Sequence, residues 1–143
     1  MDIVCAVDSS EDSFKTLREA ETLVEQIGGN LKILHCIEHQ EFRQIQSESH
    51  DHGNDPIMMD EILSMAETRI HDVASELAVP YTAVPLFGNP SSEIIDYVDT
   101  SEVDYIVLGG TKRSAAGKIL FGSVTQSVLL NSSVPVLMVP TVT

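Results

Sequence analysis

Short apolar runs alternate with helical patterns along the whole chain of 143 residues, and this alternation constrains the fold more than any other feature. The first run, DIVCAVD, is β-branched and almost continuously apolar, which is typical of a strand covered on both faces. Four similar runs follow it. The five predicted strands cover residues 2–8, 31–38, 81–87, 104–110 and 134–139.

Each segment between two predicted strands carries signals for a helix. Ser9 with Asp12 is an S-x-x-D start, Ser123 with Gln126 is an S-x-x-Q start, and proline follows a capping residue at 55–56 and 89–90. The residues expected on the buried stripes recur at helical spacing: Phe14, Leu17, Val24 and Ile27; then Ile62, Ala66, Ile70, Val73 and Leu77; then Ile94, Ile95 and Val98. Gly28-Gly29 and Pro80 end the first two helices.

Five strands alternating with four helices predict an α/β fold, in which helices cover both faces of a doubly wound parallel sheet. No internal repeat or second domain is visible, so we expect one domain over residues 1–143. Pro85 cannot donate to a strand ladder, which places the third strand at a sheet edge. If the first strand is central, Asp8 and Gly109 stand at the crevice beyond the strand ends where such sheets bind ligands.

The charge of the chain excludes one class of partner. Asp and Glu number 22 against 8 Lys and Arg, for a net charge of −14, and a general nucleic-acid binder would need a basic face. Dispersed acidity with scarce lysine favours a protein of a salt-loving microbe, such as a halophilic archaeon, over an ordinary acidic protein. No apolar run is long enough for a membrane span, so we expect no membrane contact and a cytoplasmic location. Cys5 and Cys36 are expected to be structural thiols.

The stretch GGTKRSAAGKILFGS, residues 109–123, concentrates Lys112, Arg113 and Lys118 between glycines. It matches neither the Walker loop nor the dinucleotide fingerprint, because the glycine spacing and the position after the first strand are wrong. It does hold the parts of a phosphate-binding loop: Gly109, Gly110 and Gly122 for close backbone approach, and Ser123 for a hydroxyl and a helix cap. A solvated basic patch is the alternative interpretation.

These residues resemble the universal stress protein family over nearly the whole chain. VDSSEDS, ILHCIEH, FGNPSSEII and the strand, loop and GSV helix start of residues 104–124 stand where that family has similar segments. The resemblance implies the Rossmann-like order 3-2-1-4-5 of the adenine nucleotide alpha-hydrolase type, and ATP, with or without Mg²⁺, as the ligand. It implies nucleoside contacts from Asp8 and the Cys36 backbone. It implies phosphate contacts from Gly109, Gly122, Ser123 and Val124. The second glycine of the family motif G-x-x-G-x9-G-[ST] is replaced by Lys112.

Three functions stay open. The first is a nucleotide-responsive regulatory protein that forms a homodimer through residues 134–141, an apolar sheet edge. The second is a weak phosphohydrolase, which is disfavoured because residues 109–123 contain no acid and no histidine. The third is a nucleotide-free dimer that acts through protein contacts, which would follow if Lys112 closes the site.

Two further features receive structural interpretations. His35 lies on a buried strand and is expected to be a core histidine without a chemical role. The polar stretch 39–55 is expected to be a mobile loop near the crevice. A metal site made by His50, His52, Asp51 and Asp55 is not expected, because no regular element holds these ligands in place.

Overall fold

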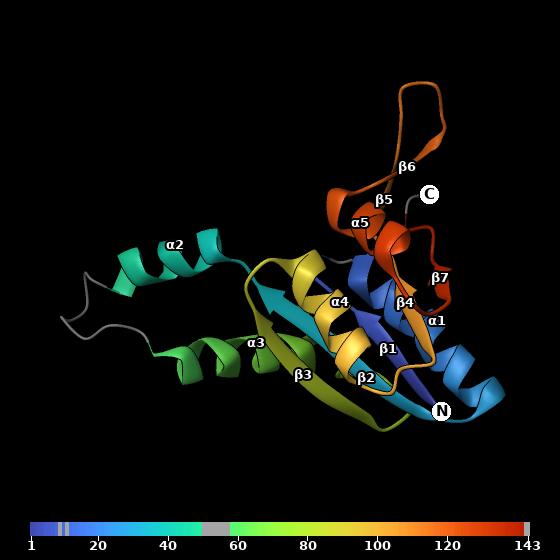
Figure 1. Cartoon of the computed structure of the whole chain (residues 1–143), viewed down its shortest axis with the longest axis horizontal. Helices are drawn as coiled ribbons and strands as arrows, with labels where there is room; N and C mark the ends of the chain where they lie inside the picture. Colours follow the sequence, from blue (N-terminus) through green and yellow to red (C-terminus); the bar gives the residue numbers. More distant parts are fainter. Residues whose placement is uncertain (9, 11, 50–57, 142–143) are drawn as a thin grey trace.

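The central sheet of the computed structural model consists of five parallel strands in the order β3-β2-β1-β4-β7 (Figure 1). The structure describes residues 1–8, 10, 12–49 and 58–141, without the side chains of Ser49 and Arg113. The strands are β1 (Asp2–Ala6), β2 (Asn30–Ile37), β3 (Tyr81–Phe87), β4 (Tyr105–Leu108) and β7 (Val136–Met138). This confirms the predicted order, with β7 as the predicted fifth strand, and it confirms that the strand with Pro85 lies at an edge.

Two helices cover each face of the sheet, because successive side chains of a strand point to opposite faces. Ile3 and Cys5 of β1 pack in the core beneath α1 (Asp12–Ile27) and α3 (Met59–Val73). Val4, between them in sequence, packs in the second core beneath α4 (Pro90–Thr100) and α5 (Ser123–Asn131). Ile3, Val4 and Cys5 are fully buried, as the apolar sequence of β1 predicted. The fold is therefore the doubly wound α/β sandwich.

One prediction for the polar stretch after β2 is wrong. Residues 39–49, expected to be part of a mobile loop, form the helix α2 (His39–Ser49). Phe42 and Ile45 lie three residues apart on one side of α2 and pack with Phe87 against the buried side chains of Ile37 and Ile62. These contacts bury one side of α2, which the largely polar composition of the segment did not predict. The rest of the stretch, with His50, Asp51, His52 and the predicted cap at 55–56, lies outside the described residues.

The helix signals were correct in part. The Asn89 side chain accepts a hydrogen bond from the Ser92 N–H at 3.1 Å, which confirms the start of α4. α3 ends at Val73, so Leu77, which was predicted on its buried stripe, lies beyond the helix. At α5 the N-cap is Gly122 and makes no side-chain hydrogen bond, so Ser123 is the first helical residue and not the cap. The proposed cap of the first helix, Ser9, lies outside the described residues.

An antiparallel hairpin interrupts the connection between β4 and α5, where a loop was expected. It consists of β5 (Thr111–Arg113) and β6 (Ile119–Phe121), and Figure 1 shows it projecting from the sheet and helices. The Ser114 N–H donates to the Lys118 carbonyl at 2.8 Å, and Gly117 supplies the positive φ of +81° that the turn needs. The residues of β5 are polar and those of β6 are apolar, so each pair of the hairpin joins one polar and one apolar residue.

Candidate functional site

A cleft of about 330 Å³ opens at the carboxyl ends of β1, β2 and β4. β1 is flanked by β2 on one side and by β4 on the other, so the order in which strands are added to the sheet reverses at this point. Its walls come from the segments that leave these strands, from the first turns of α1 and α4, and from the start of α5. The cleft is lined by Ala6, Val7, Asp8, Ser10, Asp12, Ser13, Thr16, Leu34, His35, Cys36, Glu38, Glu41, Pro90, Ile94, Leu108, Gly109, Gly110, Val124 and Thr125.

Asp8 follows β1 and presents an ionised carboxylate to the cleft. Its Oδ1 accepts hydrogen bonds from the Ser10 N–H and the Ser13 hydroxyl, both at 2.8 Å. Burial alone would raise the pKa of Asp8, but these hydrogen bonds from Ser10 and Ser13 outweigh it, and the pKa lies below its ordinary value. The same contacts hold the turn between β1 and α1, so Asp8 has a structural role as well as its place in the cleft.

The end of β2 contributes two neighbouring residues with different environments. His35 is 5% exposed, and its Nδ1 lies 2.9 Å from the Val7 carbonyl oxygen, which requires a proton on Nδ1. Its Nε2 is buried and has no hydrogen-bond partner in the part of the chain that the structure describes. The expectation of a core histidine is confirmed for its burial, but the ring also lines the cleft.

Both cysteines are neutral thiols. Burial raises the pKa of Cys5 to about 12, and burial, with the nearby Glu93, Glu38 and Glu41 carboxylates, raises the pKa of Cys36 to about 12. The Cys36 Sγ lies 3.6 Å from the Gly88 carbonyl oxygen. Because only a thiolate is a good nucleophile or metal ligand, these values agree with structural roles.

Gly109 and Gly110 carry the backbone from β4 into the hairpin past the cleft. A Cβ at Gly109 would stand 2.1 Å from the Thr16 Oγ1, which no side chain can accommodate. The Thr125 hydroxyl donates to the Gly109 carbonyl at 2.7 Å, and Gly110 has a φ of +85°. Packing and backbone conformation therefore require both glycines, independently of any ligand.

The start of α5 lies beside these glycines. The Gly122 N–H donates to the Gly110 carbonyl at 3.0 Å, which closes the base of the hairpin. The φ of Gly122 is −68°, which any residue can adopt, so its backbone conformation does not require glycine. Val124 and Thr125 line the cleft, whereas Gly122 and Ser123 do not. No side chain caps α5, and the N–H groups of a first turn have no partner within their own helix.

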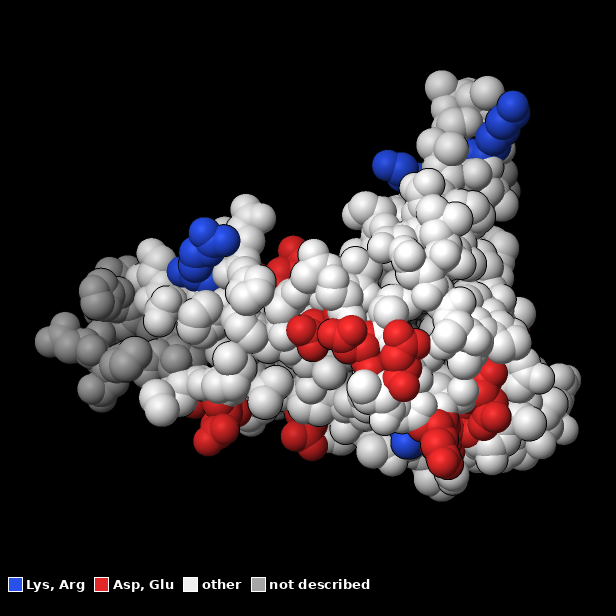
Figure 2. Space-filling model, viewed as in Figure 1, with Lys and Arg blue, Asp and Glu red and all other residues white. Residues whose placement is uncertain are grey.

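The two lysines of the stretch 109–123 lie outside the cleft lining. Lys112 on β5 and Lys118 before β6 are exposed, and neither belongs to the lining. The backbone of Arg113 is also on β5, but its side chain lies outside the described part. Figure 2 shows blue side chains on the projecting hairpin, separate from the acidic side chains on the body.

Sequence reasoning missed the hydroxyl and acidic groups of the cleft. Thr16, buried on α1, and Thr125, buried on α5, approach Gly109 from two helices that are distant in sequence. Glu41 reaches the cleft from α2 and forms an ion pair with Arg69 of α3. A signal existed for Thr16 alone, because Asp12 and Thr16 are one helical turn apart on α1.

The described residues contain neither a metal centre of protein ligands nor a membrane-spanning helix. No group of three or more His, Cys, Asp or Glu side chains is arranged to hold a metal ion within residues 1–8, 10, 12–49 and 58–141. Of the helices in this part of the chain, none has the length and apolar character needed to cross a bilayer.

Comparison with known proteins identifies close similarity to one family. The model of the universal stress protein family matches residues 1–140. A universal stress protein of Methanocaldococcus jannaschii is 25% identical over 137 residues, which cover 96% of this chain and 80% of that protein.

Two solved structures share the fold. A universal stress protein in complex with cAMP superimposes with a TM-score of 0.67 at 22% identity, covering 99% of this chain and 98% of that chain. The universal stress protein from Archaeoglobus fulgidus in complex with dAMP gives a TM-score of 0.55 at 21% identity, covering 96% of both chains.

Proposed function

Because this chain belongs to the universal stress protein family, we propose that it binds an adenine nucleotide in the cleft and acts as a nucleotide-responsive regulatory homodimer in the cytoplasm. The observation that carries the proposal is the cleft itself, at the reversal of strand order, with Asp8 on one side and Gly109 and the start of α5 on the other. The cAMP and dAMP complexes of relatives support a nucleotide as the ligand class.

The residues of the cleft fit the two ends of a nucleotide. Asp8 and the backbone at Cys36 offer hydrogen-bonding groups for the nucleoside. Gly109 and Val124 lie where the phosphate end would meet the uncapped first turn of α5, whose N–H groups and helix dipole favour an anion. Gly122 and Ser123 adjoin this turn and are proposed as further backbone contacts. The family makes ATP, with or without Mg²⁺, the first nucleotide to test.

The first experiment is direct. Purified protein is denatured, the released small molecules are identified by mass spectrometry, and the refolded or ligand-free protein is titrated with adenine nucleotides by calorimetry. Release or tight binding of an adenine nucleotide is expected. If neither occurs, the third possibility, a nucleotide-free dimer, replaces this proposal. Release of the nucleoside diphosphate from added ATP over time would instead favour phosphohydrolase activity.

A substitution at α5 localises the binding. Gly122→Val should abolish nucleotide binding, because the branched side chain would cover the first turn of α5. The fold should tolerate it, since the φ of Gly122 is −68° and its Cβ would meet only the Gly110 oxygen, at 3.4 Å. Ala116→Val adds the same side chain to the exposed tip of the hairpin and serves as the matched control. Equal affinity in the two variants would contradict the placement of the nucleotide.

The homodimer proposal rests on the edge strand β7. Its outer side has no neighbouring strand in the described sheet, and Leu137 is 41% exposed. An apolar edge of this kind tends to pair with a second chain. Light scattering should give twice the chain mass, and Leu137→Lys should give the monomer. Val139, also within residues 134–141, is 5% exposed, so a lysine there would damage the core and would not test the interface. A dimeric Leu137→Lys protein would place the interface elsewhere.

A further inference from the structure

The charge of the cleft opposes the charge of the phosphate chain that it is proposed to hold. Four carboxylates line it, those of Asp8, Asp12, Glu38 and Glu41. Within the described residues the lining includes no lysine and no arginine. A site built for a highly charged anion usually supplies cationic side chains, as phosphate-binding sites do with Arg and Lys.

The carboxylates differ in how well their charge is compensated. The charge of Glu41 is balanced by its ion pair with Arg69. Asp8 is held ionised by hydrogen bonds from two serines, which are neutral and leave its negative charge in place. Glu38, in the connection from β2 to α2, is exposed and makes no ion pair within the described part of the chain. Asp12, in the first turn of α1, is also exposed and without an ion pair among the described residues, so Asp8, Asp12 and Glu38 contribute most of the negative potential.

The lysines of the hairpin do not offset this potential within the cleft. Lys112 and Lys118 are exposed and outside the lining, and in Figure 2 the blue side chains of the hairpin stand apart from the body. The positive potential available to a phosphate in the cleft comes from helix N-termini such as that of α5, each equivalent to roughly half an elementary charge. This is suited to a short phosphate group and does not neutralise a long one.

We infer that the cleft selects its nucleotide by phosphate charge: it binds adenosine monophosphate more tightly than metal-free ATP, and a divalent cation on the phosphates of ATP restores most of the lost affinity. This inference rests on the proposed function and specifies its ligand. The cation accompanies the nucleotide and is not held by a protein metal site. The repulsive groups are Asp8, Asp12 and Glu38, and the attractive groups are the helix N-termini at the cleft, that of α5 among them.

The test is a set of calorimetric titrations with adenosine, AMP and ATP at one pH and ionic strength, in EDTA and again with Mg²⁺. In EDTA, AMP should bind about tenfold more tightly than ATP, which corresponds to about 1.4 kcal/mol. Mg²⁺ should recover most of the loss for ATP and leave AMP nearly unaffected. Added KCl should narrow the difference in EDTA, because salt screens the repulsion.

The outcomes separate the inference from the function on which it rests. If ATP binds as tightly as AMP in EDTA, the inference is overturned and nucleotide binding stands. If none of the three ligands binds, the proposed function fails and the inference fails with it.

Two variants test the electrostatic cause. Glu38→Gln keeps the shape of the side chain and removes its charge, so the ratio of the ATP and AMP dissociation constants in EDTA should fall about threefold. Glu102→Gln removes an exposed carboxylate that precedes β4, at the opposite end of the sheet, and should keep the ratio of the unmodified protein. Equal ratios in the two variants would overturn the electrostatic cause.

A third variant tests the hairpin. If the hairpin lysines served the phosphates, Lys112→Glu would weaken ATP binding and spare AMP, and that result would also overturn the inference.

Discussion

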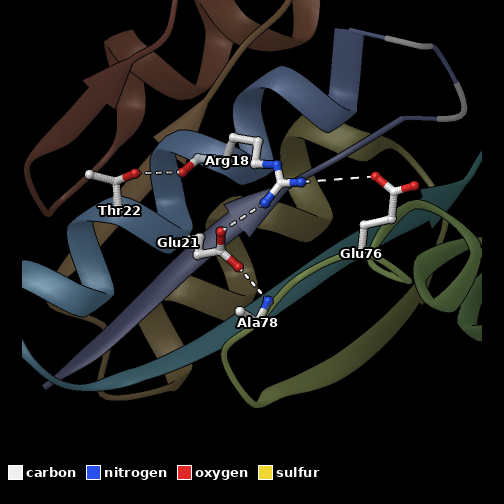
Figure 3. A network of polar contacts seen from close by, with 5 residues as sticks. All are labelled: Arg18, Glu21, Thr22, Glu76 and Ala78. Carbon is white, nitrogen blue, oxygen red and sulfur yellow. Dashed lines mark hydrogen bonds and ion pairs between the residues drawn. The ribbon is translucent and has the colours of Figure 1, made fainter.

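Replacing Glu21 by alanine should destabilise the fold by about 2 kcal/mol, because it leaves an amide of the chain without its partner. Glu21 lies on the inner side of α1, and its side chain is 9% exposed. Its Oε2 accepts the Ala78 N–H at 2.6 Å, and its Oε1 accepts Arg18 Nη1 at 3.1 Å (Figure 3). The first bond ties the connection between α3 and β3 to α1, across 57 positions of the sequence.

The magnitude follows from the state of the groups that remain. A partly buried N–H that loses a charged acceptor costs about 1–3 kcal/mol. Glu76, the other acid near Arg18, is 70% exposed and 3.9 Å from it, so Glu76→Ala should cost less than about 0.5 kcal/mol. Glu21→Gln keeps an oxygen for the Ala78 N–H and should lie between the two.

Urea unfolding of the three variants measures these differences. With a slope of about 2 kcal/mol per molar urea, the Glu21→Ala midpoint should fall by about 1 M while the slope stays constant. The Glu76→Ala midpoint should move by less than a quarter of that. Equal shifts for Glu21→Ala and Glu76→Ala would refute this expectation, because they would show that the partly buried Ala78 amide has another partner or that the connection does not depend on it.

Three other predictions concern the site and the surface. The pKa of Asp8 is lowered in the fold, so its stabilising contribution is present above the unfolded value of about 3.9 and is lost as the pH falls through the lower folded value. Asp8→Asn should therefore flatten the acid unfolding curve below about pH 4, and an unchanged curve would contradict this. Gly109→Ala should cost about 2–3 kcal/mol, because its Cβ would overlap Thr16, whereas Gly122→Ala should cost less than about 1 kcal/mol in the same thermal melts. With a net charge of −14, the melting temperature should rise between low and molar KCl, and a flat or falling trend would remove the halophile interpretation.

Local patterns were sufficient for the five strands of the central sheet and for the presence of α1, α3, α4 and α5, whereas the strand order came from the family resemblance. β1 reads as a strand because Ile3, Val4 and Cys5 are consecutive and apolar, and a strand between two helical layers buries both its faces. Pro85 marks an edge strand because it has no N–H to donate. Asn89 caps α4 through a hydrogen bond from the Ser92 N–H, three positions later. Such signals depend on neighbours within a turn or a strand, so they are present in the sequence itself.

Long-range packing decided what the sequence left open. α2 is stabilised by the ring contact between Phe42 and Phe87, 45 positions later, and no local pattern predicts that contact. The lysines of residues 109–123 suggested a phosphate-binding loop, but the pairing of Thr111 with Phe121 and of Arg113 with Ile119 turns the segment into a hairpin outside the cleft. The cleft is instead lined by carboxylates from α1, α2 and the ends of β1 and β2. Parallel strands that are distant in sequence end at the same edge of the sheet, and this brings the carboxylates together. The type of an element follows from its own residues, whereas the charge of a site is the sum over segments that only the tertiary fold brings together.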